Sequence, residues 1–178
     1  MLKLPVINLY GGPGSGKSTT AALVFGKLKQ LGYNVELCQE YAKKCVWEKS
    51  FDVLSDQLYV LGKQNHKLHV LQDQVDCAIT DSPLLISEIY NKKLIQLTPI
   101  MLECFNLYDN FNYVIERTKE YNPSGRMQNE EQAREIDQIT IDVLRKYGIY
   151  YTTIPYGDLG VSCIVDDFNR YMCRDKSN

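Results

Sequence analysis

The 178-residue chain has only two histidines, and none of its six cysteines forms a C-x-x-C pair. The sequence therefore contains no recognisable zinc-binding pattern. It also has no signal-peptide h-region and no apolar run long enough to span a bilayer. We expect a cytoplasmic protein without a membrane partner, whose cysteines are free thiols that mostly fill the core.

The chain also lacks an excess of basic charge, a linker and an internal repeat. Twenty Lys and Arg residues against 22 Asp and Glu residues give a formal net charge of −2. Nucleic acid is therefore possible but not favoured as a partner, because only a local basic groove could bind it. Since no Pro-, Ser- or Gly-rich spacer divides the sequence, we expect residues 1–178 to form a single domain. The oligomeric state stays open.

Short apolar segments alternate with helical patterns along the whole chain. The expected strands cover 4–10, 34–40, 75–83, 111–117 and 149–155. The expected helices cover 17–33, 51–74, 84–93, 98–110, 129–148 and 161–172. The helix at 129–148 has the clearest ends, because Asn129 and Gln132 fit a capping box and Gly148 fits a stop. Five strands alternating with helices predict an α/β three-layer sandwich.

A glycine-rich segment, GGPGSGKSTT at 11–20, directly follows the first expected strand. It fits G-x-x-x-x-G-K-[ST], the phosphate-binding loop or P-loop, whose backbone N–H groups and following helix hold nucleotide phosphates. In this motif Lys17 reaches the β- and γ-phosphates, and the Ser18 hydroxyl is a Mg²⁺ ligand. We expect ATP and Mg²⁺ as cofactors, with GTP left open as the nucleotide. The expected nucleotide-binding residues are Gly11, Gly12, Pro13, Gly14, Ser15, Gly16, Lys17, Ser18 and Thr19.

Two carboxylates are expected at the carboxyl ends of strands, where an open α/β sheet binds its ligands. Asp81 lies at the carboxyl end of the strand in CAITDSP, and Glu40 ends the strand at 34–40 and begins the segment EYAKK. Asp81 fits a Mg²⁺-organising aspartate or a group that orients an acceptor, with a helix cap after Pro83 as the structural alternative. Glu40 fits a base that accepts a proton from an attacking hydroxyl, with a solvated loop position as the alternative. The sequence does not decide which of the two is the base.

A polar segment between the fourth strand and the next helix carries several arginines. We expect it to form a lid at about 117–134, because phosphoryl transfer needs charge neutralisation and exclusion of water. The expected catalytic residues there are Arg117, Arg126 and Arg134. A solvated, charged helix start is the alternative for each of them. Weaker signals are Gln57 and Gln64, which fit either solvated helix positions or readers of a base edge.

Together these segments resemble the small P-loop kinases of the nucleoside and nucleotide kinase group. They are similar to the corresponding segments of compact phage-type P-loop kinases or ATPases and of the kinase domain that phosphorylates nicotinamide riboside. The segments that carry the resemblance are GGPGSGKST, EYAKK, ITDSP and YNPSGRMQ, within residues 4 to about 150. The resemblance implies a central five-stranded parallel sheet, an arginine-bearing lid and an acceptor pocket over the sheet. For a phage-encoded chain the compartment would be the host cytoplasm.

The expected activity is transfer of the ATP γ-phosphate to a small nucleoside- or nucleotide-type acceptor. Typical nucleoside monophosphate kinases have an Asp-Arg pair at the third strand, whereas Ser82 follows Asp81 here. The acceptor therefore stays open. Two alternatives remain: a kinase for a modified base or an end in DNA, and a P-loop ATPase that drives a partner.

Overall fold

The structure is a computed structural model that describes residues 3–91, 94–118, 121–122 and 129–175. Its centre is a five-stranded sheet with the order β2-β3-β1-β4-β5, and every neighbouring pair is parallel. The strands are β1 (Pro5–Tyr10), β2 (Val35–Cys38), β3 (Cys77–Thr80), β4 (Asp109–Glu116) and β5 (Thr152–Pro155). The expected five-stranded parallel sheet is confirmed, and the first strand lies at its centre.

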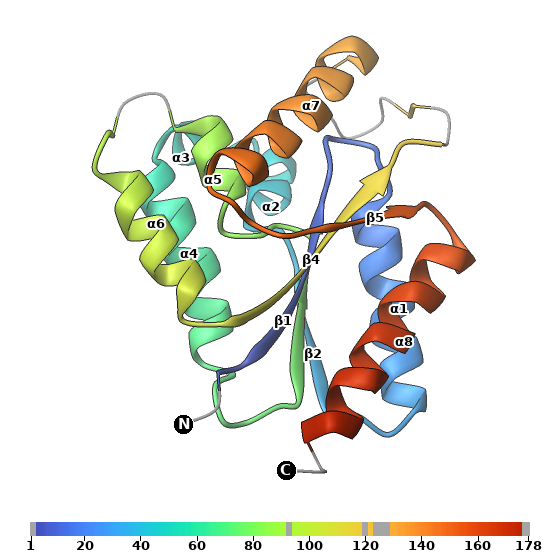
Figure 1. The fold of residues 1–178 in the computed structure, drawn as a ribbon. Helices are drawn as coiled ribbons and strands as arrows, with labels where there is room; N and C mark the ends of the chain where they lie inside the picture. Colours follow the sequence, from blue (N-terminus) through green and yellow to red (C-terminus); the bar gives the residue numbers. More distant parts are fainter. Residues whose placement is uncertain (1–2, 92–93, 119–120, 123–128, 176–178) are drawn as a thin grey trace.

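Helices cover both faces of the sheet and complete a three-layer arrangement (Figure 1). On one face lie α1 (Lys17–Gln30) and α8 (Asp158–Asp175). The opposite face carries α4 (Gln57–His69), α5 (Ile86–Tyr90) and α6 (Leu97–Asn106), with the short α2 (Tyr41–Trp47) and α3 (Phe51–Ser55) beside them. α7 (Glu130–Lys146) crosses the carboxyl end of the sheet, at the top of the view, near the loop after β1.

Each face of the sheet has its own apolar core. One core joins the sheet to α1 and α8 through residues such as Leu9, Val24 and Phe168, all fully buried. The other joins the sheet to α4, α6 and α7, with Leu68 and Leu144 among its buried members. Because both faces are covered, the inner strands β1 and β3 are buried along almost their whole length, as expected for a parallel sheet, whereas the edge strands β2 and β5 also have exposed positions.

The helical region before β3 differs from the single helix expected at 51–74. The chain turns at Asp56, which separates α3 from α4, and the Asp56 carboxylate accepts the N–H of Tyr59 at 3.1 Å. This cap starts a new helix, whereas Gly62 lies inside α4 without interrupting it. α2 was not expected at all, because seven residues are too few to show a helical repeat.

The ends of α7 confirm the sequence prediction. Asn129 and Gln132 form a reciprocal capping box, with N–H to oxygen distances of 2.9 Å in both directions. Gly148 follows the helix with φ +64°, a left-handed conformation that favours glycine. The start of α7 is therefore fixed locally, which matters because its first turns lie against the P-loop.

The six cysteines are free thiols, as expected. Cys38, Cys45 and Cys77 are buried, and Cys104 and Cys163 are partly buried and pack against the two cores, so the expectation that most cysteines fill the core is confirmed. Burial raises the pKa of the Cys38 thiol to about 11. Within the described ranges, no helix has both the length and the apolar content needed to cross a membrane.

Candidate active site

The P-loop joins β1 to α1 at the carboxyl end of the sheet. Gly14 and Gly16 have φ values of +80° and +106°. Residues that carry a Cβ rarely adopt such backbone angles. Lys17 begins α1 and folds back over the loop, with Nζ donating to the carbonyl of Gly11 at 2.6 Å and of Gly12 at 3.0 Å. The loop therefore has the conformation that its motif predicts, with the lysine amine held over the glycines.

The remaining P-loop residues lie where the motif predicts them. Ser15 is fully buried and donates its backbone N–H to the carbonyl of Gly12 at 3.2 Å. Pro13 is half-buried at the turn. Ser18 and Thr19 are exposed in the first turn of α1.

Asp81 brings the P-loop helix and the end of β2 together. Its Oδ2 accepts the hydroxyl of Ser18 at 2.5 Å, and its Oδ1 accepts the backbone N–H of Glu40 at 2.9 Å. The carboxylate is almost fully buried, at 4% exposure, and both of its oxygens are engaged. The two residues that the sequence suggests as Mg²⁺ ligands are thus hydrogen-bonded to each other, and Asp81 does not cap α5, whose N-cap is Leu85.

Glu40 lies beside the lysine amine rather than in bulk solvent. Burial lowers the pKa of Lys17, and the carboxylates of Glu40, Asp81 and Asp137 oppose that shift in this order of strength. Glu40 also raises the pKa of Tyr90, after burial as the main cause. A half-buried carboxylate that affects both groups lies at the mouth of the phosphate site.

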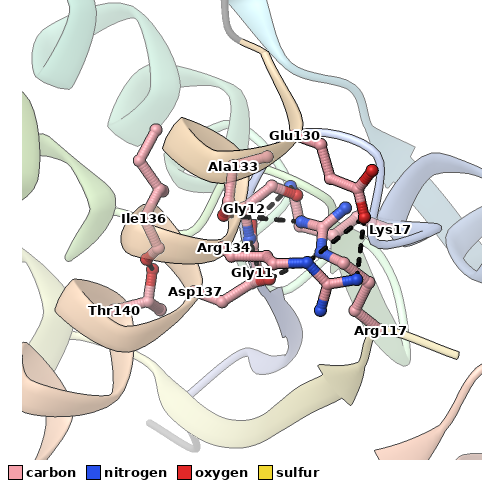
Figure 2. A network of polar contacts seen from close by, with 10 residues as sticks. All are labelled: Gly11, Gly12, Lys17, Arg117, Glu130, Ala133, Arg134, Ile136, Asp137 and Thr140. Atoms are coloured by element: carbon pink, nitrogen blue, oxygen red, sulfur yellow. Dashed lines mark hydrogen bonds and ion pairs between the residues drawn. The ribbon is translucent and has the colours of Figure 1, made fainter. Parts of the chain in front are cut away.

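Arg117 and Asp137 form the third part of the site (Figure 2). Arg117 follows β4, and its Nε donates to Asp137 Oδ2 on α7 at 2.7 Å. The other carboxylate oxygen, Oδ1, accepts the backbone N–H of Gly12 in the P-loop at 2.5 Å. The Arg117 side chain is only 4% exposed, and its Nη2 lies 3.5 Å from the carbonyl of Ala133. One carboxylate therefore connects the P-loop, the end of β4 and α7.

Asp137 was missed by the sequence analysis. It lies inside an amphipathic helix whose charged residues are mostly exposed. In the sequence, Asp137 therefore cannot be told apart from the residues on the solvated face of that helix. The available signal was its position, because Asp137 lies one turn after Ala133, which is fully buried. A carboxylate next to the buried stripe of a helix contacts the neighbouring element more often than one on the opposite face.

Two tyrosine rings cover the glycines of the P-loop. A Cβ on Gly16 would lie 2.3 Å from the ring of Tyr156, which follows β5. A Cβ on Gly14 would lie 3.1 Å from the ring of Tyr121 and 3.3 Å from Arg117 Nη1. Gly16 is therefore required by close approach as well as by its φ value, whereas at Gly14 the contact is only tight and the φ value is the stronger reason for glycine.

The other residues that the sequence suggested for the site have no described contact with the P-loop. Arg134 is exposed, and its Nη2 is paired with Glu130 one helical turn away at 2.8 Å. Figure 2 draws this pair beside the cluster, but no described contact joins it to the P-loop. Arg126 lies outside the described residues. Gln57 and Gln64 are buried, which corrects the solvated alternative, and Gln64 Nε2 donates to Thr80 Oγ1 at 3.0 Å.

The site offers the groups that nucleotide phosphates and Mg²⁺ need. Arg117 Nη1 and Ser15 Oγ are buried without a hydrogen-bond partner among the described residues, and both lie at the P-loop. Such orphaned polar atoms are costly unless a ligand satisfies them. The Ser18 hydroxyl and the Asp81 carboxylate supply the oxygen ligands that Mg²⁺ prefers. The residues therefore fit a magnesium-bound nucleotide.

A parallel sheet with this P-loop, followed by an aspartate on the neighbouring strand, defines a P-loop nucleotide-binding protein. The chain belongs to the family described as AAA domain, whose model matches residues 6–160. No curated protein matches the sequence.

Solved structures with the same fold include two with informative descriptions. The NadR protein in complex with NR has a TM-score of 0.64 at 17% identity, covering 88% of this chain and 44% of that one. A deoxyadenosine kinase from M. mycoides, with products dCMP and dCDP bound, has a TM-score of 0.57 at 18% identity, covering 93% and 99%. At these identities the likeness establishes the fold alone, a parallel sheet flanked by helices with a P-loop after its first strand.

Proposed function

We propose that this protein is a Mg²⁺-dependent kinase that transfers the γ-phosphate of ATP to a hydroxyl of a small nucleoside- or nucleotide-type acceptor. The observation that carries the proposal is the arrangement of Ser18, Asp81 and Glu40 at the carboxyl end of the sheet. The Ser18 hydroxyl and the Asp81 carboxylate supply oxygen atoms of the kind that Mg²⁺ prefers, and Glu40 is a second carboxylate near the P-loop lysine. The description of a similar structure as a deoxyadenosine kinase with its products bound agrees with this proposal.

In this mechanism one set of residues binds the phosphates and a second set holds the metal ion. The P-loop amides and Lys17 bind the phosphates, and Arg117 presents its buried Nη1 to them close to Gly14. Bound ATP and Mg²⁺ supply the phosphoryl group and neutralise part of its charge. Ser18 and Asp81 would hold the metal ion, and Asp81 fixes the Ser18 hydroxyl for that purpose.

The structure favours Glu40 over Asp81 as the general base. Asp81 already accepts two hydrogen bonds and is 4% exposed, so it has little room for an acceptor hydroxyl. Glu40 is half-buried at the end of β2, and its backbone N–H is fixed by Asp81. A carboxylate held there at the mouth of the site can take the proton that leaves the acceptor hydroxyl.

A phosphate-transfer screen tests the function. Purified protein is incubated with γ-labelled ATP and Mg²⁺, and with nucleosides, nucleoside monophosphates or oligonucleotides in separate reactions. We expect the label on one class of small acceptor, and no transfer with Lys17→Ala. A matched control is Lys27→Ala, because Lys27 is exposed in the last turn of the same helix. This control should retain the wild-type rate.

The same screen distinguishes the alternatives. Label found only as free phosphate, with each acceptor class, would contradict the kinase proposal and support the ATPase. Label found on oligonucleotides alone would support a kinase for DNA ends or modified bases. A second donor, γ-labelled GTP, determines which nucleotide is preferred.

A further inference from the structure

The carboxylate of Asp137 occupies an unusual place for an acidic group. It lies beside a loop whose backbone amides and lysine favour anions, and where phosphates are expected to bind. Its two oxygens are 2.5 Å from the Gly12 nitrogen and 2.7 Å from Arg117 Nε. A carboxylate held here repels phosphate unless a cation offsets its charge, and Arg117 is that cation.

The orientation of Arg117 depends on this contact. A guanidinium has five N–H donors in one rigid plane, so fixing Nε determines where Nη1 points. With Nε on Asp137 and Nη2 near the carbonyl of Ala133, Nη1 faces Gly14. Nη1 is buried and has no described partner, which leaves it as a fixed donor over the P-loop.

The Gly12 amide depends on the same carboxylate. The 2.5 Å contact with Asp137 fixes the first turn of the P-loop against α7. The approach is so close that a Cβ on Gly12 would lie 2.3 Å from the carbonyl of Ala133.

We propose that Asp137 is a positioning residue that holds the Arg117 guanidinium and the Gly12 amide in the arrangement that binds the nucleotide phosphates. It does not touch the phosphates itself. It acts through Arg117, whose Nη1 it aims at them, and through the P-loop, whose first turn it holds against α7. The inference rests on the nucleotide-binding part of the proposed function and is independent of the acceptor.

The test measures binding of Mg²⁺–ADP and of a non-hydrolysable ATP analogue by calorimetry. The variants are Asp137→Asn, Arg117→Ala, the double variant, and Asp142→Asn as a matched control. Asp142 lies on the same helix, is exposed, and accepts a hydrogen bond only from Gln138 among the described contacts. Thermal unfolding of each variant confirms that the fold is retained.

We expect Asp137→Asn to weaken binding of both nucleotides about tenfold, the low end of what a hydrogen bond to a charged group contributes. The Asp142→Asn control should bind like the wild type. Because Asp137 acts largely through Arg117, and because its carboxylate repels phosphate once the guanidinium is removed, the double variant should bind no more weakly than Arg117→Ala. A merely structural aspartate would give independent losses that multiply, and that result would overturn the proposal.

Unchanged nucleotide affinity in Asp137→Asn would also overturn it. A wild-type protein that binds no nucleotide would instead contradict the proposed function. If Asp137→Asn fails to fold, NMR of the wild type decides. The Gly12 amide and Arg117 Nε–H signals should lie downfield and stay there when ADP is added. Signals at random-coil positions would show that the carboxylate does not hold them.

Discussion

The hydroxyl of Ser18 donates to Asp81 Oδ2 over 2.5 Å, although 63 positions separate the two residues in the chain. The contact joins the first turn of α1 to the end of β3. It forms because β3 lies next to β1, so that their carboxyl ends reach the same edge of the sheet. This adjacency turns two separate sequence motifs into one candidate metal site.

Replacing Asp81 by Asn tests that site. The amide keeps the size of the carboxylate and can still bond Ser18 and the N–H of Glu40, but the negative charge is lost. We expect kcat to fall by about two orders of magnitude or more, with a higher Mg²⁺ concentration needed for half-maximal rate. The measurement is a Mg²⁺ titration of the steady-state rate.

Glu40→Gln is the comparison for that experiment. It should lower kcat without moving the Mg²⁺ requirement, because Glu40 is proposed to take the proton and not to bind the metal. A Glu40→Gln variant that shifts the Mg²⁺ curve, beside an Asp81→Asn variant with unaltered activity, would exchange the two roles.

Gly12→Ala is expected to separate α7 from the P-loop. The new Cβ would lie 2.3 Å from the carbonyl of Ala133, a backbone atom that cannot move without the helix. Overpacking of this kind costs roughly 1–3 kcal/mol in the free energy of unfolding. The measurement is urea denaturation of the nucleotide-free protein.

Gly26→Ala provides the matched control for that substitution. Gly26 lies inside α1, and a Cβ there meets nothing within 4 Å. Alanine restricts the unfolded chain and favours the helix. The free energy of unfolding of this variant should therefore increase by about 0.4–1 kcal/mol. Equal effects of the two substitutions would contradict the close contact at Gly12.

A second polar cluster fixes the far end of α7. Glu88 on α5 accepts hydrogen bonds from Thr98 at 2.5 Å, Tyr147 at 2.6 Å and Lys146 at 3.1 Å. Burial alone raises the pKa of Glu88, but these three donors outweigh it and hold the pKa below its ordinary value. The ionised carboxylate is therefore the form that stabilises the fold.

The sign of the pH dependence follows from that lowered pKa. The contribution of Glu88 is complete above the unfolded-state value of about 4.3 and is lost as the pH falls through the lower folded-state value. Glu88→Gln should reduce the free energy of unfolding by about 1 kcal/mol at pH 7 and flatten its decline in acid. Urea denaturation from pH 7 downward measures both effects. Glu103→Gln, at an exposed position of α6, should change neither.

The fold could be predicted from the sequence because its signals are local. The apolar run before the glycines predicts β1, and the capping box at Asn129 predicts the start of α7. Each depends on residues within a few positions of one another. α2 and the turn at Asp56 escaped prediction because short helices show no clear period and an exposed aspartate resembles any other polar residue.

The site could be predicted only in part, for a related reason. Lys17, Ser18 and Asp81 belong to recognisable motifs at strand ends. Asp137 reaches Gly12 across 125 positions of sequence, and nothing near it in the chain marks that contact. Gln64 was expected to be solvated or to read a base edge, but it is buried and donates to Thr80. That hydrogen bond depends on how α4 packs on β3, which the sequence near Gln64 does not reveal.

The last prediction concerns Arg126, which lies outside the described residues and keeps the role expected from the sequence. In that role its guanidinium neutralises charge that is largest during phosphoryl transfer, so its effect should appear in the transition state. Arg126→Ala should then lower kcat by roughly 10³-fold, the low end of what an arginine finger supplies, while the nucleotide Kd stays near its wild-type value. Steady-state kinetics with calorimetry on the same samples measures both.

Two further variants make the Arg126 test specific. Arg126→Lys should restore little activity, because a point charge cannot reproduce the planar fork of donors. Arg145→Ala removes an exposed arginine from the last turn of α7 and should leave both constants unchanged. An Arg126→Ala variant that loses only nucleotide affinity would make Arg126 a ground-state clamp. The fixed donor for the transferring phosphate would then be Arg117, since Asp137 already holds that guanidinium over the P-loop.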